Sequence, residues 1–150
     1  MENARYTKCG KEIDDLIDAQ MDQIVRHIRS RLGDNVVSIV LTGSFGRGEG
    51  SVLISEAGEV QPLKDYDIVV AVRRLVKANT ITRLRNECYS LLSLQNPEAT
   101  LYHFSSFNLS IDQVPVYRTR VRPDLSSYDL RMASRVLYGK NYPSSLQVTL

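Results

Sequence analysis

The chain has 150 residues, with 19 lysines and arginines against 17 aspartates and glutamates, and two cysteines, Cys9 and Cys88. A chain of this length buries about two thirds of the surface that it exposes when unfolded, so we expect one compact domain over residues 1–150 that needs no disulfides. The near balance of charge gives no argument for a nucleic-acid partner, and two cysteines predict neither a disulfide framework nor a zinc cluster. No apolar stretch approaches the roughly 20 residues that span a bilayer, and the polar N-terminus is unlike a secretory signal. We therefore expect a cytoplasmic protein without a membrane partner.

The spacing of apolar residues predicts the main elements of the fold. Two segments show the periodicity of amphipathic helices, two are short runs rich in β-branched residues, and one alternates apolar with small polar residues. In chain order we predict a helix over residues 13–32 that Gly33 ends, a strand over 36–42, a strand over 66–72, a helix over 81–92 and a strand over 104–111. This order is typical of an α/β (α+β) domain with a small mixed β-sheet flanked by helices.

A glycine-rich loop follows the predicted strand over residues 36–42. Its four glycines lack the Cβ atoms that would keep an anion away from the backbone, and they tolerate the positive φ that aims successive N–H groups at it. Ser44 adds a hydroxyl donor, and Arg47 a guanidinium that can hold two phosphate oxygens. The loop fits neither the Walker pattern, which needs a lysine where Glu49 stands, nor the dinucleotide fingerprint, which needs a glycine where Ser51 stands. We interpret Gly43, Ser44 and Arg47 as nucleotide-binding residues; a plain surface turn is the alternative.

Two aspartates stand at the start of the predicted strand over residues 66–72. Asp65 and Asp67 are two residues apart, so they project from one face of the strand, while Tyr66 points to the other. Carboxylates that close together repel each other unless a cation lies between them, and magnesium prefers such oxygen ligands together with substrate phosphates. The pair predicts a divalent ion, although aspartates are also common at solvated strand ends.

A two-metal site for phosphoryl chemistry generally needs a further carboxylate. Asp112 is the best candidate, because it closes the predicted strand over residues 104–111 shortly before Pro115. If that strand lies beside the one headed by Asp67, Asp112 can reach the same metals. Asp124 and Asp129 are the fallbacks, since both stand near the start of a predicted helix, where an acidic residue often serves only as a cap.

The loop and the aspartates together resemble the nucleotidyltransferase superfamily related to DNA polymerase beta, in its minimal, prokaryotic-type form. That resemblance implies that Gly43, Ser44 and Arg47 bind the triphosphate and that Asp65, Asp67 and Asp112 are catalytic residues that ligate two magnesium ions. The run over residues 128–139 also resembles the helix ending in Leu-Tyr-Gly that closes many such domains.

The spacing of the two motifs departs from the compact members of that superfamily. Twenty residues separate Ser44 from Asp65, and the intervening segment over residues 50–64 resembles an inserted hairpin with its turn at Ala57-Gly58. Arg118, Arg120 and Arg122 alternate in a later extended segment, and we interpret them as solvated charges at a sheet edge.

These patterns predict a magnesium-dependent enzyme that transfers a nucleoside monophosphate from a nucleoside triphosphate, with ATP as the expected donor, to a hydroxyl-bearing acceptor. Because the net charge is only +2, we rank a protein or a small molecule above nucleic acid as acceptor. The acceptor pocket could be completed either by a partner protein or by a second copy of this chain in a homo-oligomer. The alternative function is a non-catalytic or antitoxin-like binding module that partners a small helical protein; three clustered carboxylates favour catalysis.

Overall fold

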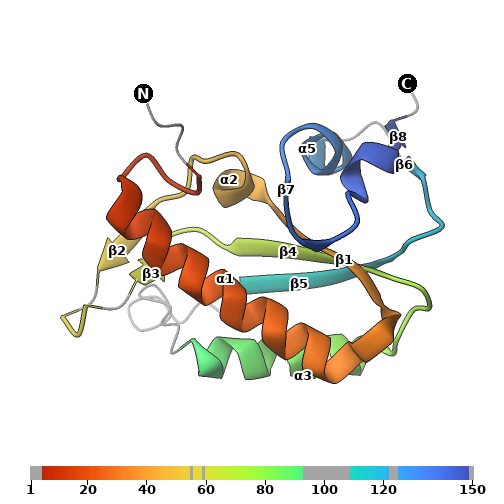
Figure 1. Ribbon diagram of the computed structural model, residues 1–150, viewed down its shortest axis with the longest axis horizontal. Helices are drawn as coiled ribbons and strands as arrows, with labels where there is room; N and C mark the ends of the chain where they lie inside the picture. The colour runs from red at the N-terminus through yellow and green to blue at the C-terminus, as the bar shows by residue number, and fades with distance from the viewer. Residues whose placement is uncertain (1–4, 55, 59, 93–108, 122–124, 149–150) are drawn as a thin grey trace.

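The computed structural model describes residues 5–54, 56–58, 60–92, 109–121 and 125–148. Its elements follow one another as shown in Figure 1. They are α1 (Lys11–Leu32), the 3-10 helix η1 (Gly33–Asn35), β1 (Val36–Thr42), α2 (Gly43–Gly46), β2 (Val52–Ile54), β3 (Val60–Pro62), β4 (Tyr66–Val72), α3 (Ala78–Leu91), β5 (Leu109–Pro115), β6 (Arg120–Val121), α5 (Leu125–Met132), β7 (Arg135–Gly139), the 3-10 helix η2 (Pro143–Ser145) and β8 (Gln147–Val148).

A four-stranded mixed sheet forms the centre of the domain. Its strand order is β5-β4-β1-β7, in which β1 runs antiparallel to both β4 and β7 while β4 and β5 are parallel. Two small two-stranded sheets, β2–β3 and β6–β8, stand beside it. The predicted fold class, a small mixed sheet flanked by helices, is therefore confirmed.

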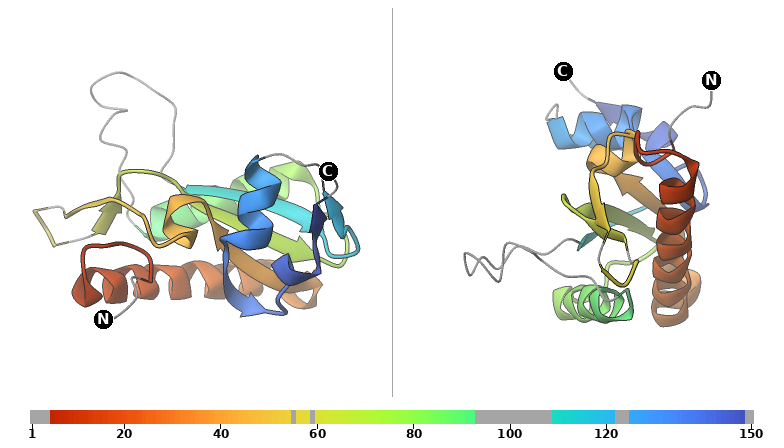
Figure 2. Two further views of the ribbon diagram at one scale, coloured as in Figure 1. Left: turned by 90° about the horizontal axis from the view of Figure 1, so that it is seen from above. Right: turned by 90° about the vertical axis from the view of Figure 1, so that its left-hand side faces the viewer.

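Helices α1 and α3 cover one face of this sheet, and α5 with the C-terminal segment lies on the other side (Figures 1 and 2). The first face carries the main core, because alternate residues of β1, β4 and β5 point into it and meet the apolar stripe of α1. Ile17, Ile24 and Ile28 of α1 are fully buried there. A smaller cluster that includes Tyr142 and Leu146 covers part of the second face. Asp67 and Asp112 project from this second face.

Several predicted elements are confirmed almost to the residue. The strands predicted over residues 36–42 and 66–72 are β1 and β4. The long helix begins two residues earlier than predicted and ends before Gly33, whose φ of 57° no longer fits a helix. The segment after the glycine-rich loop forms an antiparallel hairpin of β2 and β3.

The prediction of a helix over residues 128–139 is wrong. Helix α5 ends at Met132, and Arg135–Gly139 forms β7, which pairs antiparallel with β1. The free edge of β1 offers unpaired backbone groups, and a segment with Val136 and Tyr138 has the residue types that favour a strand. Tertiary pairing therefore decides the conformation of this segment.

Strand β5 also differs from its prediction. It runs from Leu109 to Pro115, so Asp112 lies in the middle of the strand rather than after its end, whereas residues 104–108 lie outside the described part of the chain. Arg118 stands in the turn after β5, Arg120 begins β6, and Arg122 is again outside the described residues. None of the helices described is both long enough and apolar enough to cross a lipid bilayer.

Candidate functional site

Asp67 lies against the turn that joins β1 to α2. Thr42, the last residue of β1, is paired with Asp67 across the sheet, and Gly43 follows with a φ of +72°. A side chain at position 43 would be strained by this backbone conformation, and its Cβ would collide with the Asp67 carboxylate. The absence of a Cβ at Gly43 is thus what lets the carboxylate approach the backbone of the loop.

The other side of the Asp67 carboxylate is held by β5. In the parallel pairing of β4 and β5, Ser110 is the partner of Asp67, and its hydroxyl donates a hydrogen bond of 2.9 Å to Asp67 Oδ1. Sequence reasoning did not single out Ser110, because only the register between two strands 43 residues apart brings it to this place. Asp67 is therefore fixed between the Gly43 turn and Ser110.

Asp112 and Asp65 flank Asp67. Asp112 pairs with Val69, two residues beyond Asp67 on β4, so both carboxylates project from the second face of the sheet. Asp65 precedes β4 and is exposed. Asp67 and Asp112 thus lie on one face of the β4–β5 ladder, two residue pairs apart, and Asp65 stands just before it.

The pKa values of two of these aspartates reflect this crowding. Burial raises the pKa of Asp67; the Ser110 hydrogen bond and the charge of Arg47 oppose the rise, and the charge of Asp112 adds to it. Although Asp65 is exposed, partial burial of its carboxyl and the negative charge of Asp67 raise its pKa. A bound cation would relieve the repulsion that these shifts report.

The carboxylates do not form a closed metal cluster as they stand. Among the residues that the structure describes, no three His, Cys, Asp or Glu side chains converge closely enough to hold an ion by themselves. Asp67 interacts with Asp65 and with Asp112, and is the member common to both pairs. Magnesium keeps several waters and is usually bound by one or two carboxylates plus substrate phosphates, so an open set of this kind fits it.

Arg47 connects the glycine-rich loop to α5. Its Nη1 lies 2.7 Å from Asp129 Oδ2, and its Nε lies 3.5 Å from Glu49 Oε2. The backbone at Gly46 supports this docking, because a Cβ there would meet the carbonyl oxygens of Leu41 and Ala133. Asp129, which sequence reasoning placed only as a fallback ligand, is therefore the ion-pair partner of the predicted phosphate-binding arginine.

The loop itself is closed by its own hydrogen bonds. The N–H groups of Arg47 and Glu49 donate to the carbonyl oxygens of Gly43 and Ser44, at 3.1 and 2.8 Å. Ser44 is half-buried in the first turn of α2, where N–H groups have no acceptor within the helix. The loop is thus a compact turn rather than an open surface excursion.

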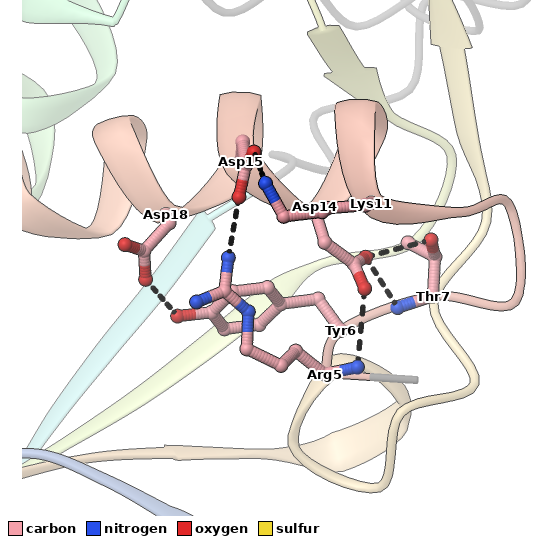
Figure 3. Close-up of polar contacts among 7 residues, drawn as sticks. All are labelled: Arg5, Tyr6, Thr7, Lys11, Asp14, Asp15 and Asp18. Atoms are coloured by element: carbon pink, nitrogen blue, oxygen red, sulfur yellow. Dashed lines mark hydrogen bonds and ion pairs between the residues drawn. The ribbon is translucent and has the colours of Figure 1, made fainter. Parts of the chain in front are cut away.

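The N-terminal segment braces the far end of this loop. The Gly50 N–H donates to the carbonyl oxygen of Tyr6 at 2.9 Å, and Figure 3 shows how the segment is tied to α1. The buried Asp14 carboxylate accepts hydrogen bonds from the N–H groups of Arg5 and Thr7 and from the Thr7 hydroxyl. Tyr6 donates its hydroxyl to Asp18 at 2.6 Å. Sequence reasoning missed this brace; its only local signal is a pair of aspartates one helical turn apart beside an apolar stripe.

A cavity of about 450 Å³ opens beside Asp67 on the second face of the sheet. Strands β4 and β5 form its floor, while α5 and Tyr142 contribute to its walls. Its lining residues are Thr42, Gly43, Asp67, Ile68, Val69, Ser110, Asp112, Val114, Arg118, Asp129, Leu130 and Tyr142. Among the described residues, the lining thus combines three carboxylates and one arginine with apolar side chains such as Val69, Val114 and Leu130. Ser44, Arg47 and Asp65 lie outside this lining.

Comparison with known proteins finds likeness at the level of structure. No protein-family model and no curated protein matches the sequence. A structure of a tri-AMPylated HEPN toxin from Shewanella oneidensis in complex with an MNT antitoxin matches with a TM-score of 0.50 at 12% identity, over 84% of this chain and 75% of that chain. A mutant of the MntA–HpeT toxin–antitoxin complex, in which two aspartates two residues apart are replaced by glutamate, matches with a TM-score of 0.52 at 13% identity, over 80% and 73% of the two chains. At such low identity the likeness concerns the fold, and the chain has the nucleotidyltransferase-like fold that its loop and aspartate motifs predicted.

Proposed function

We propose that this protein transfers a nucleoside monophosphate from a nucleoside triphosphate to a hydroxyl-bearing acceptor in a magnesium-dependent reaction. The observation that carries the proposal is the setting of Asp67. Its carboxylate is held between the Gly43 turn and Ser110, and it lies within electrostatic reach of Asp65 and Asp112. Crowded carboxylates beside a glycine-rich turn match the needs of a metal-bound triphosphate.

Asp65, Asp67 and Asp112 would hold two magnesium ions. Bound magnesium would lower the pKa of the acceptor hydroxyl and neutralise the charge on the leaving pyrophosphate. In the reaction the acceptor hydroxyl loses its proton to water and its oxygen forms a bond to the α-phosphorus, while the bond from that phosphorus to its bridging oxygen breaks and pyrophosphate leaves. Ser110 and Gly43 fix the orientation of the Asp67 carboxylate before any ligand binds.

Gly43, Ser44 and Arg47 would bind the triphosphate. Arg47 already donates to Asp129, but a guanidinium carries five N–H donors, and its contacts with Asp129 and Glu49 leave others for phosphate oxygens. The ion pair also keeps the side chain ordered beside the loop. An arginine that is held in place in advance loses less entropy when it binds a ligand.

The structural neighbours support AMP as the transferred group. One of them contains a tri-AMPylated toxin, which makes ATP the donor to test first and a protein hydroxyl one acceptor to test. In the other complex the two mutated aspartates have the same spacing as Asp65 and Asp67.

A second candidate function is an antitoxin-like binding module. Both neighbours are toxin–antitoxin complexes, and this favours a partner protein for the present chain. Incubation with MgATP and a lysate separates the two functions, because only the enzyme releases pyrophosphate. Stable capture of a small helical protein without pyrophosphate release would favour the binding module.

Titration with a non-hydrolysable ATP analogue tests the proposal directly. We expect wild type to bind the analogue in a magnesium-dependent manner and Asp67→Asn to lose that dependence. Asp34→Asn is the matched control, since Asp34 is an exposed aspartate in η1, before the opposite end of β1. Equal affinity of wild type and Asp67→Asn, with or without magnesium, would refute the metal assignment.

A further inference from the structure

The cavity beside Asp67 has the size of a binding site for a small molecule. Its volume of about 450 Å³ lies within the roughly 300–1,000 Å³ that such sites occupy. Asp67 and Ser110 line it beside Thr42, and Asp112 lines it two residues further along β5. A polynucleotide strand needs an extended groove with several cations, and neither feature is found in this lining.

From the carboxylates the cavity follows β5. Asp112 and Val114 project from the same face of this strand, and the strand ends at Pro115, roughly 10 Å beyond Asp112 at the usual rise per residue. The Arg118 N–H donates to the carbonyl oxygen of Pro115, so Arg118 stands in a turn just past that end. The cavity therefore has carboxylates and an arginine at different places along β5 and the turn after it, with apolar lining residues that include Val114 and Leu130.

Arg118 makes the far end positive. Its guanidinium forms no hydrogen bond or ion pair with any residue in the described part of the chain, whereas Arg47 neutralises Asp129. The Tyr142 hydroxyl donates to the Arg118 carbonyl oxygen at 2.6 Å, which fixes the backbone of this turn. Arg118 is also close enough to Tyr142 for its charge to oppose the rise in the Tyr142 pKa that burial causes. Arg118 is exposed, as expected of a solvated edge, and it also lines the cavity.

We propose that this cavity binds the acceptor, and that the acceptor is a small hydroxyl compound with an apolar middle and a carboxylate or phosphate group at its other end. The hydroxyl would lie beside Asp112, the apolar part on Val69 and Val114, and the anionic group at Arg118. This inference rests on the proposed function, since only nucleotidyl transfer requires a hydroxyl at Asp112. Ser44 and Arg47 lie outside the cavity and Gly43 lines it, so the triphosphate would reach the acceptor cavity at Gly43 and Asp67.

Two matched probes test the inference on the full chain with magnesium and the ATP analogue present. 4-(Hydroxymethyl)benzoate has the hydroxyl, the apolar ring and the carboxylate, whereas benzyl alcohol lacks the carboxylate. We expect the benzoate to bind more tightly than benzyl alcohol by ligand-observed NMR, and Arg118→Gln to weaken the benzoate by about tenfold, the effect of losing one charge-assisted contact. Benzyl alcohol should bind Arg118→Gln as it binds wild type.

Arg120→Gln is the matched control, because Arg120 is an exposed arginine two residues away that does not line the cavity. Equal weakening by Arg118→Gln and Arg120→Gln would overturn the inference, as would equal affinity of both probes for wild type. Competition between the benzoate and the ATP analogue would also overturn it, because the cavity would then hold the nucleotide. Failure of the proposed function is a separate result: the analogue would not bind with magnesium, whatever the probes do.

Discussion

Replacing Gly43 with alanine tests the close approach between the loop and Asp67. At a φ of +72° a side chain costs about 1–2 kcal/mol of backbone strain. The new Cβ would also force the Asp67 carboxylate out of the position in which it accepts the Ser110 hydrogen bond. A hydrogen bond to a charged acceptor at a half-buried site is worth about 1.5 kcal/mol. We therefore expect Gly43→Ala to lower the free energy of unfolding by about 2.5–3.5 kcal/mol.

Gly58→Ala separates the two contributions. Gly58 has a similar φ of +82°, but no atom lies within 4 Å of the position that its Cβ would take. This variant should lose only the backbone strain, about 1–2 kcal/mol. The assay is urea unfolding of both variants in metal-free buffer at pH 7, followed by circular dichroism. Equal losses for Gly43→Ala and Gly58→Ala would refute the reasoning, because the carboxylate would then not lie against the loop.

Three further predictions concern single carboxylates. Because the folded-state pKa of Asp67 is raised, its ionised form destabilises the metal-free protein at neutral pH. We therefore expect Asp67→Asn to be more stable than wild type at pH 7. In urea unfolding this gain in stability should shrink as the pH falls through the raised pKa toward the ordinary 3.8. A gain that grows at low pH would contradict the sign. Asp129→Asn removes the Arg47 ion pair, so its stability should fall by no more than about 1 kcal/mol because both side chains are partly exposed. Hydrogen exchange should nevertheless show faster exchange in α5, and unchanged exchange would argue against docking through this pair. Asp14→Ala leaves two backbone N–H groups and the Thr7 hydroxyl without their buried acceptor, so unfolding experiments should show a loss of about 3 kcal/mol or more, and a loss below about 1 kcal/mol would contradict the brace.

Features set by local pattern were predictable from the sequence. Local sequence patterns predict β1, β4 and α1. The β-branched runs of the two strands and the apolar stripe of the helix, with the residues that bound them, each lie within one segment. Asp65 and Asp67 are recognisable for the same reason, since a spacing of two places them on one face of a strand.

Features that depend on pairing between distant segments were not predictable. The segment of β7 was expected to be helical, and the free edge of β1 decided otherwise. The Arg47–Asp129 ion pair joins residues 82 positions apart. Ser110 is an unremarkable serine until the parallel register places it opposite Asp67. In each case the deciding partner lies far along the chain, where single-segment patterns carry no information.

The register between β4 and β5 links the stability of the core to the geometry of the site. Leu109 and Ile111 are 1% and 4% exposed, and they pair with Tyr66 and Ile68 on the core face. Because side chains alternate along a strand, a slip of one residue would expose both and would turn Ser110 toward the core instead. Burial of two such side chains is worth about 3–6 kcal/mol, more than the repulsion between partly solvated carboxylates on the opposite face costs. The apolar packing against α1 and α3 thus keeps Ser110 and Asp112 beside Asp67, although the crowding of negative charge there opposes it.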